Sequence, residues 1–327
     1  MDIIATITPH FTPDKVESIL NAGATILRVN GAHSTADVIA GFVAELRDIW
    51  GDRVRIMVDL PTNKVRTKNL DDPIAFDQGE RFSLHPLNLN YPKLHEIAQV
   101  GDVVTVNDGR NRLRIVRIDG SAIEFVAESR GVLGNNRGLI FEREIHAPGF
   151  PLFLERDLEL VEIINDLRVD LVGISYLRYP EEKVQARKLI RDASSLVFKI
   201  ETRVACKNYR GLLEPGDKIL IDRGDLAGEI GLIHIPQAQA RIIRYAHRSD
   251  VSVYCATQFL ASMVASPVPL VSEVCSLYEI LKVGIDGLQL SEETAFGKYP
   301  VAVVQWVRRL EELLAEEGDI PHVAYAG

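Results

Sequence analysis

The sequence predicts an α/β protein built on a (β/α)8 TIM barrel, with a small all-β domain inserted after the third barrel strand. Three observations support this. Short β-branched runs alternate with longer amphipathic segments, which is typical of βα units around a parallel sheet. The alternation is interrupted once, over residues 67–148, where turn signals favour hairpins. Polar residues follow most of the predicted strands, and in barrels the carboxyl ends of the strands carry the site.

Eight short apolar runs are predicted to be the barrel strands. They are rich in Ile, Val and Leu and end at polar or Gly-containing segments, as strands buried on both faces do. The predicted strands are Ile3–Ile7, Thr25–Asn30, Val54–Leu60, Asp170–Ser175, Leu196–Glu201, Lys218–Asp222, Val251–Ala256 and Gly287–Leu290.

Seven longer segments between and after these runs are predicted to be helices, because their apolar residues recur at helical spacing and several end near Gly or Asn. They cover residues 13–23, 35–50, 155–167, 180–193, 236–248, 271–284 and 301–317.

The interval from Thr67 to Pro148 has strand patterns in place of the helical one. The stretches GERFSL, GDVVTVNDGRNRLRIVRIDGSAIEFVAES and GVLGNNRGLI contain DG and NN dipeptides and repeated Gly, which favour hairpins. We therefore predict a barrel domain over residues 1–66 and 149–327 and a β-rich domain over 67–148. Such an insertion would lie at the carboxyl face of the barrel, where it could close like a lid.

Composition and charge limit the classes of function. The 327 residues are 46% hydrophobic and 25% charged, enough for a large core. A net charge of −9 argues against nucleic-acid binding. Three Cys without CxxC spacing indicate neither a disulfide framework nor a structural zinc site, so a cytoplasmic location is expected. No apolar run is long enough to span a membrane, and the first residues lack a basic leader.

The predicted strand ends carry the candidate chemistry. Glu201 and Asp225 follow neighbouring strands, and two carboxylates with water and substrate oxygens are what Mg²⁺ or Mn²⁺ usually takes from a protein. Lys199 and Arg28 are cations that could neutralise a phosphoryl group in transfer. Gly224 lies where backbone N–H groups could face an anion at a helix start.

These features favour metal-assisted chemistry on a small phosphorylated or carboxylated molecule. The alternative, that Glu201 and Asp225 are ordinary rim carboxylates paired with Lys199 and Arg223, stays open on these residues alone.

Ten segments, in order along the chain, also carry a family resemblance. They are ATITP, LRVNGAHS, VDLPTNKVRT, VNDGRNRL, GNNRGL, ISYLR, KIE, IDRGDLAGEIG, CATQFLASM and LSEETAFGKYP. In these segments the chain resembles the pyruvate kinase family. The resemblance implies the same barrel (A domain) and inserted lid (B domain). It also implies that the family's carboxyl-terminal regulatory domain is missing, because the sequence ends after the last barrel helix.

The resemblance implies a role for each matching residue. Glu201 and Asp225 would hold the divalent metal, and Lys199, Thr257 and Arg28 would be catalytic. Substrate would be bound by Arg223, Gly224, Asp225, Thr257, Ser291 and Glu293, and nucleotide by Asn30, His33, Arg66, Ser175 and Asp108.

The family's need for K⁺ is expected to be absent. Leu60 and Lys64 match a branch of the family that works without K⁺, and Ala32 replaces a serine that helps to bind it. Lys64, together with Asp59, would substitute for the monovalent cation because a tethered ammonium supplies the same charge.

Three functions stay open. The first is a phosphotransferase that uses phosphoenolpyruvate, ADP and Mg²⁺. The second is a metal-dependent lyase or related enzyme that acts through a pyruvate-type enolate without nucleotide. The third is a catalytically weak paralogue that binds metabolite or nucleotide. A homo-oligomer through the barrel helices is expected under each.

Overall fold

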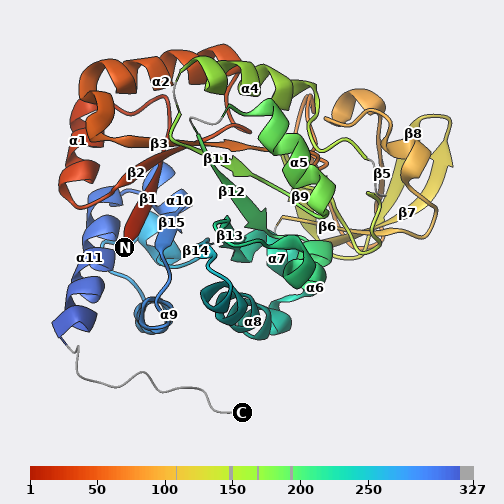
Figure 1. Ribbon diagram of the computed structural model, residues 1–327. Coiled ribbons are helices and arrows are strands. Elements are labelled where there is room, and N and C mark those ends of the chain that lie inside the picture. The colour runs from red at the N-terminus through yellow and green to blue at the C-terminus, as the bar shows by residue number, and fades with distance from the viewer. Residues whose placement is uncertain (108, 147–149, 168, 192–193, 317–327) are drawn as a thin grey trace.

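The computed structural model describes residues 1–107, 109–146, 150–167, 169–191 and 194–316. Eight parallel strands close a barrel in the order β1-β15-β14-β13-β12-β11-β3-β2 (Figure 1). This confirms the predicted fold class. The strands are β1 (Asp2–Ile7), β2 (Ile26–Asn30), β3 (Arg55–Leu60), β11 (Leu171–Ile174), β12 (Ser195–Ile200), β13 (Lys218–Asp222), β14 (Ser252–Ala256) and β15 (Gly287–Leu290).

Helices surround the barrel. The predicted ones are present as α1 (Pro13–Asn21), α2 (Ala36–Trp50), α4 (Glu155–Asp166), α5 (Pro180–Leu189), α8 (Ile235–Arg248), α9 (Val271–Lys282) and α11 (Pro300–Glu316). Among the described residues, four further helices were not among the predicted segments: α3 (Leu94–Ile97), α6 (Arg203–Leu212), α7 (Arg223–Ile230), of which only a start at Gly224 was expected, and α10 (Glu292–Ala295). Short 3-10 turns lie at η1 (Gly51–Arg53), η2 (Pro86–Asn88), η3 (Leu232–His234) and η4 (Ala261–Val264).

Helix starts follow local sequence rules. Thr12, Thr35 and Thr202 cap α1, α2 and α6 by accepting a backbone N–H with the side-chain oxygen, which satisfies one orphan donor of each first turn. Asp222 does the same for α7. Because α7 follows β13 without a loop, acidic residues at this junction are held near the barrel's carboxyl end.

The segment between β3 and β11 forms antiparallel sheets that project to one side of the barrel (Figure 1). One sheet has five strands in the order β10-β6-β7-β8-β5, and the other pairs β4 with β9. The strands are β4 (Ile74–Phe76), β5 (Arg81–Leu84), β6 (Val103–Val106), β7 (Asn111–Asp119), β8 (Ala122–Ala127), β9 (Gly131–Leu133) and β10 (Ile140–Phe141).

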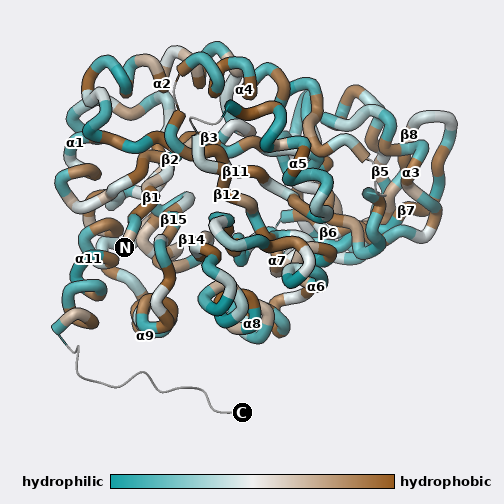
Figure 2. The backbone as a smooth tube through the Cα atoms, in the orientation of Figure 1, coloured by the Kyte–Doolittle hydropathy of each residue, from teal (hydrophilic) through white to brown (hydrophobic). Residues whose placement is uncertain are grey.

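Apolar residues separate into distinct cores, and Figure 2 shows the barrel strands as largely hydrophobic. The layer between strands and helices is the largest cluster, and the insertion has its own, around Phe125 and Leu113. A third fills the barrel interior with Ile4, Ile26, Met57, Leu171, Val197, Leu220, Tyr254 and Ala256. The barrel is therefore packed inside, and the buried charged groups Asp59, Lys199 and Glu201 lie at or next to the carboxyl ends of their strands.

Candidate active site at the carboxyl end of the barrel

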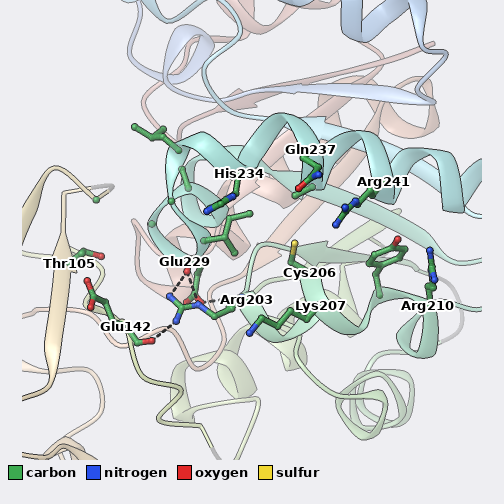
Figure 3. Close-up of a pocket in the computed structure, with 18 of the residues that line it drawn as sticks. Thr105, Glu142, Arg203, Cys206, Lys207, Arg210, Glu229, His234, Gln237 and Arg241 are labelled. Atoms are coloured by element: carbon green, nitrogen blue, oxygen red, sulfur yellow. Dashed lines mark hydrogen bonds between the residues drawn. The ribbon is translucent and has the colours of Figure 1, made fainter. Parts of the chain in front are cut away.

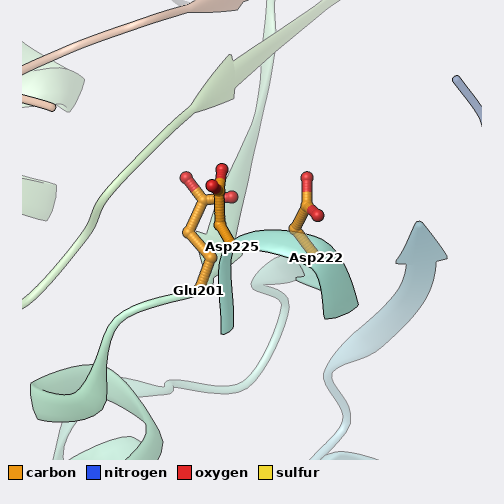
Figure 4. Close-up of side chains that lie close together, drawn as sticks. All are labelled: Glu201, Asp222 and Asp225. Atoms are coloured by element: carbon orange, nitrogen blue, oxygen red, sulfur yellow. The ribbon is translucent and has the colours of Figure 1, made fainter. Parts of the chain in front are cut away.

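Three carboxylates converge where β12 and β13 end. Oxygen atoms of Glu201, Asp222 and Asp225 all lie within 4.8 Å of one another. Figure 4 shows Glu201 and Asp225 close together and Asp222 on the adjoining turn. The predicted metal pair is thus brought together, and Asp222 joins it although the sequence reasoning did not select it. Asp222 is the last residue of its strand and directly precedes Arg223 and Gly224. This position could have marked it as a site residue.

Neighbouring parallel strands explain this convergence. Strand β12 pairs with β13 in a register that sets Lys199 opposite Leu220 and Ile200 opposite Ile221. Glu201 follows β12 directly, and Asp222 closes β13. Asp225 lies in the first turn of α7, three residues further on.

The ammonium group of Lys199 lies within this cluster. Its Nζ atom is 3.0 Å from Oε2 of Glu201, 3.2 Å from Oδ2 of Asp222 and 3.8 Å from Oδ2 of Asp59. Burial by itself would lower the pKa of Lys199, but Glu201, Asp222 and Asp59 outweigh burial and raise the pKa well above its ordinary value. Lys199 is therefore a permanent cation and not a base near neutral pH.

The carboxylates differ in their surroundings. Burial raises the pKa of Glu201 to about 7, with Lys199 opposing and Asp225 reinforcing the rise. Burial also acts to raise the pKa of Asp222, but Lys199 and the hydroxyl of Thr257 prevail and lower it to about 2. The Oε1 atom of Glu201 accepts the N–H of Tyr176 at 2.8 Å.

The other oxygen of Glu201 shows that the cluster suits a cation. Its Oε2 atom is buried and, within the described part of the chain, no donor is aligned to hydrogen-bond to it, although Lys199 is near. Hard carboxylate oxygens on converging side chains are the donor set that Mg²⁺ and Mn²⁺ prefer. The residues present therefore fit a divalent metal.

Arg28 and Asp59 form a buried pair beside Lys199. The Nε and Nη2 atoms of Arg28 donate to Oδ2 of Asp59 at 3.0 and 2.6 Å, and Nη1 donates to Thr6 at 3.1 Å. The carboxylate lies so close to β11 that a Cβ atom at Gly173 would be 1.9 Å from Oδ1 of Asp59. Only glycine leaves room for this side chain.

Lys64 is paired with Asp225 and not with Asp59. Its Nζ atom donates to Oδ1 of Asp225 and lies 5.1 Å from the ring centroid of Tyr176. The two residues proposed together as a cation substitute thus belong to separate pairs, Lys64–Asp225 and Arg28–Asp59. Lys64 still places a positive charge at the site, beside the carboxylate cluster.

Thr257, Arg223 and Gly224 form a linked turn. The hydroxyl of Thr257 donates to Oδ1 of Asp222 at 2.7 Å, and the N–H of Gly224 donates to the same atom at 3.2 Å. The guanidinium of Arg223 donates to the carbonyl oxygens of Thr257 and Gln258 and stacks on Phe259.

The backbone N–H of Gly224, which was expected to face an anion, lies in this turn. The N–H of Gly224 is engaged by its own helix cap, Asp222, so it does not face an anion freely. Thr257 and Gln258 have φ values of 77° and 57°, in the left-handed region that non-glycine residues seldom adopt. Such backbone geometry is found most often at functional sites.

The residues assigned to nucleotide lie beside a cluster of cations. Arg66 donates to the carbonyl oxygen of Asn136, whose amide also lies 3.0 Å from Nδ1 of His33. Burial and four cations, which are Arg66, Arg28, Arg137 and Lys64, lower the pKa of His33 to about 4. Four cations therefore lie near His33, and Arg137 is one of them although the sequence reasoning did not select it.

The remaining predicted site residues are in local contacts. The side chain of Asn30 accepts the N–H of Ala32 at 3.0 Å, and the carbonyl of Ser175 accepts the hydroxyl of Thr62 at 2.7 Å. Buried Glu293 accepts the N–H of Ser291 at 2.9 Å. Asp108 lies outside the described residues.

Comparison with known proteins agrees with a barrel whose polar site lies at its carboxyl end. The family model described as "Pyruvate kinase, barrel domain" matches residues 1–304. The chain is 29% identical over 320 residues to the pyruvate kinase of Aeropyrum pernix, covering 94% of this chain and 69% of that protein. It is 28% identical to that of Thermococcus litoralis (96% and 69%) and 29% identical to that of Pyrobaculum aerophilum (97% and 72%).

The fold and the carboxylate–lysine cluster first define the class, a (β/α)8-barrel protein whose polar cluster at the carboxyl end fits a divalent cation. The family match is more specific: this chain belongs to the pyruvate kinase family. Over the described residues, no helix is both long and apolar enough to cross a membrane.

Proposed function

We propose that this protein is a phosphotransferase that moves the phosphoryl group of phosphoenolpyruvate to ADP and releases pyruvate and ATP. The observation that carries the proposal is the position of Lys199, a buried cation 3.0 Å from Glu201 and 3.2 Å from Asp222, beside the only acidic group of three in the described residues that could hold a metal. Phosphoryl transfer depends mainly on positioning and charge stabilisation, which this arrangement can supply.

Glu201 and Asp225 would hold Mg²⁺ or Mn²⁺, with Asp222 adjoining. When bound, the divalent cation supplies positive charge to the phosphate and carboxylate oxygens of the substrate. Lys199 stays protonated, since its carboxylate neighbours raise its pKa, and would stabilise the charge on the phosphoryl group in transfer. Arg28 would add a second cation from β2, through the Asp59 carboxylate that lies close to both Arg28 and Lys199.

The nucleotide would bind near Arg66, His33 and Arg137. The pKa of His33 is lowered first by burial and then by Arg66, Arg28, Arg137 and Lys64, and these four nearby cations support the placement because they favour phosphate oxygens. The same cations favour a site that takes nucleotide phosphates over a lyase site without nucleotide. Thr257 would act near the enolate carbon, positioned through its bond to Asp222.

Several finer points belong to the proposal. Activity would not require K⁺, since Lys64 already supplies a fixed positive charge at the site. Residues 67–148 would move as a lid on the barrel formed by 1–66 and 149–327; the boundary residues 147–149 lie outside the described part. Assembly through barrel helices and a cytoplasmic location stay predictions.

A coupled assay with phosphoenolpyruvate, ADP and Mg²⁺ tests the function. We expect pyruvate formation that depends on all three and is lost in Lys199→Met, with Lys218→Met, a lysine at the start of the neighbouring strand, as control. Absence of turnover in the wild-type protein would contradict the proposal. Calorimetry with oxalate, pyruvate and ADP would then distinguish the two alternatives: the lyase binds the acids without nucleotide, and the weak paralogue binds without turnover.

A further inference from the structure

A cavity lies away from the carboxylate cluster. Its volume is about 1180 Å³, and it lies between α6, the segment from Ala227 to His234, and α8, with the inserted sheet on its other side (Figure 3). Thr105 and Glu142 are its labelled residues from the insertion. Glu201, Asp222 and Asp225 do not line it, so it is a separate site, which we call the α6–α8 groove.

The walls of the groove are strongly basic, although the chain as a whole carries a net charge of −9. Helix α6 contributes basic residues at positions i, i+4 and i+7, and α8 contributes two more three residues apart, so each set shares one face of its helix. Glu142 and Glu229 are the only acidic residues among the described ones that line the groove. The basic residues are Arg112, Arg203, Lys207, Arg210, Arg241 and Arg244.

Most of these basic side chains form no ion pair with a carboxylate of the described residues. Arg112 pairs with Glu128 and Glu142, but Arg203 donates to the carbonyl oxygens of Glu229 and Glu142, which do not neutralise it. In the parts of the chain that the structure covers, four exposed cations that line the groove form no ion pair with any carboxylate: Lys207, Arg210, Arg241 and Arg244.

We propose that the α6–α8 groove binds a small phosphate-bearing anion at a site distinct from the catalytic centre. Guanidinium groups bind phosphate oxygens through paired hydrogen bonds, and several cations that have no carboxylate partner line this one cavity. The cavity volume suits a ligand the size of a sugar phosphate or nucleotide. The proposal does not depend on the reaction at the carboxylate cluster.

The groove would also couple its ligand to the insertion. Ile140 of β10 and Gly109 lie against Gly228 of α7, so the insertion touches the helix whose first turn carries Asp225. A bound anion would contact basic residues of the barrel and Arg112 of the insertion together. It would therefore favour the arrangement in which the insertion rests on α7.

Cys206 offers a direct test, because its half-buried thiol lines the groove, whereas Cys275 is exposed on α9 outside it. The probe is inorganic pyrophosphate with EDTA, and the readout is the rate of alkylation by iodoacetamide at each cysteine, measured by mass spectrometry. We expect pyrophosphate to slow alkylation of Cys206 severalfold and to leave Cys275 unchanged. In R241Q/R244Q, half-protection should need about tenfold more pyrophosphate, since charge-assisted bonds are lost.

The matched control is R248Q, which removes an exposed arginine of the same helix that does not line the groove. It should behave like the wild-type protein. Calorimetric titration of the same three proteins repeats the test without relying on thiol reactivity. Equal pyrophosphate affinity in the wild type and R241Q/R244Q, or no binding in either, would overturn the proposal. Protection by polyglutamate but not by pyrophosphate would also overturn it, since the ligand would then be an acidic polypeptide.

Discussion

The ammonium group of Lys199 lies 3.0 Å from Oε2 of Glu201, an oxygen with no aligned hydrogen-bond donor among the described residues. The pair is buried, so each charge depends on the other. Removing one partner of a buried ion pair leaves an uncompensated charge and costs about 3 to 5 kcal/mol.

The first prediction concerns Lys199→Met. Without the ammonium, the carboxylates of the Glu201–Asp222–Asp225 cluster and Asp59 repel one another. The free energy of unfolding of the metal-free variant should therefore fall by about 3 to 5 kcal/mol. Activity should fall by about 10³-fold or more, because charge stabilisation is lost. Thermal unfolding with and without Mn²⁺ checks the expected loss of stability. Mn²⁺ should raise the melting temperature of the variant more than that of the wild type; an equal rise would contradict this account.

A second prediction follows from the contact between Asp59 and Gly173. In Gly173→Ala the new methyl group would overlap Oδ1 of Asp59, which must move and loosen its bonds to Arg28. We expect the free energy of unfolding, measured by chemical denaturation, to fall by about 1 to 3 kcal/mol. Gly41→Ala in α2 is the control, because a Cβ atom there meets nothing within 4 Å; it should stabilise by about 0.5 to 1 kcal/mol. Equal effects at the two sites would argue against the close packing described.

His33 provides a pH-dependent test. Its folded pKa of about 4 lies below the ordinary value of 6.5, so the unfolded chain takes up the proton first. The stability from neutral His33 is fully present above pH 6.5 and is lost as pH falls through about 4. ADP phosphates among these cations should raise the pKa of His33 in an NMR titration, with His33→Gln to assign the resonance. No change with ADP would place the nucleotide elsewhere.

The contact of Lys64 with Asp225 leads to a prediction about cations. The wild-type rate should be the same in K⁺ and in Na⁺, because the ammonium already supplies the charge. Lys64→Gln should lower kcat/KM by about tenfold or more, as expected when one charge near the phosphates is lost. A steady-state assay at constant ionic strength checks both. Activation of the wild type by K⁺ alone would show that Lys64 does not replace it.

The sequence predicted the barrel well, because strand runs such as Lys218–Asp222 and Gly287–Leu290 are apolar and flanked by clear breaks. Helix α6 was not predicted, because its segment RVACKNYRGL is mostly polar and buries only Ala205, Tyr209 and Leu212. Helix α7 is only eight residues long, too short for a periodic pattern.

At the site, residue types predicted which side chains collect at the strand ends but not how they pair. Asp222 was not selected because the sequence pattern assigns it only to the end of a strand. In the fold it also caps α7 and contacts Lys199. The pairing of Lys64 with Asp225 joins residues 161 positions apart. Such a contact is set by how the barrel closes, which local sequence patterns do not contain.

The most direct test of the central claim is the anomalous difference density of crystals soaked in Mn²⁺ and oxalate. We predict one strong peak within coordination distance, about 2.0 to 2.3 Å, of carboxylate oxygens of both Glu201 and Asp225, beside the ammonium of Lys199. No peak there, or a peak bound by other residues with Glu201 turned away, would contradict the assignment of this cluster as the metal site.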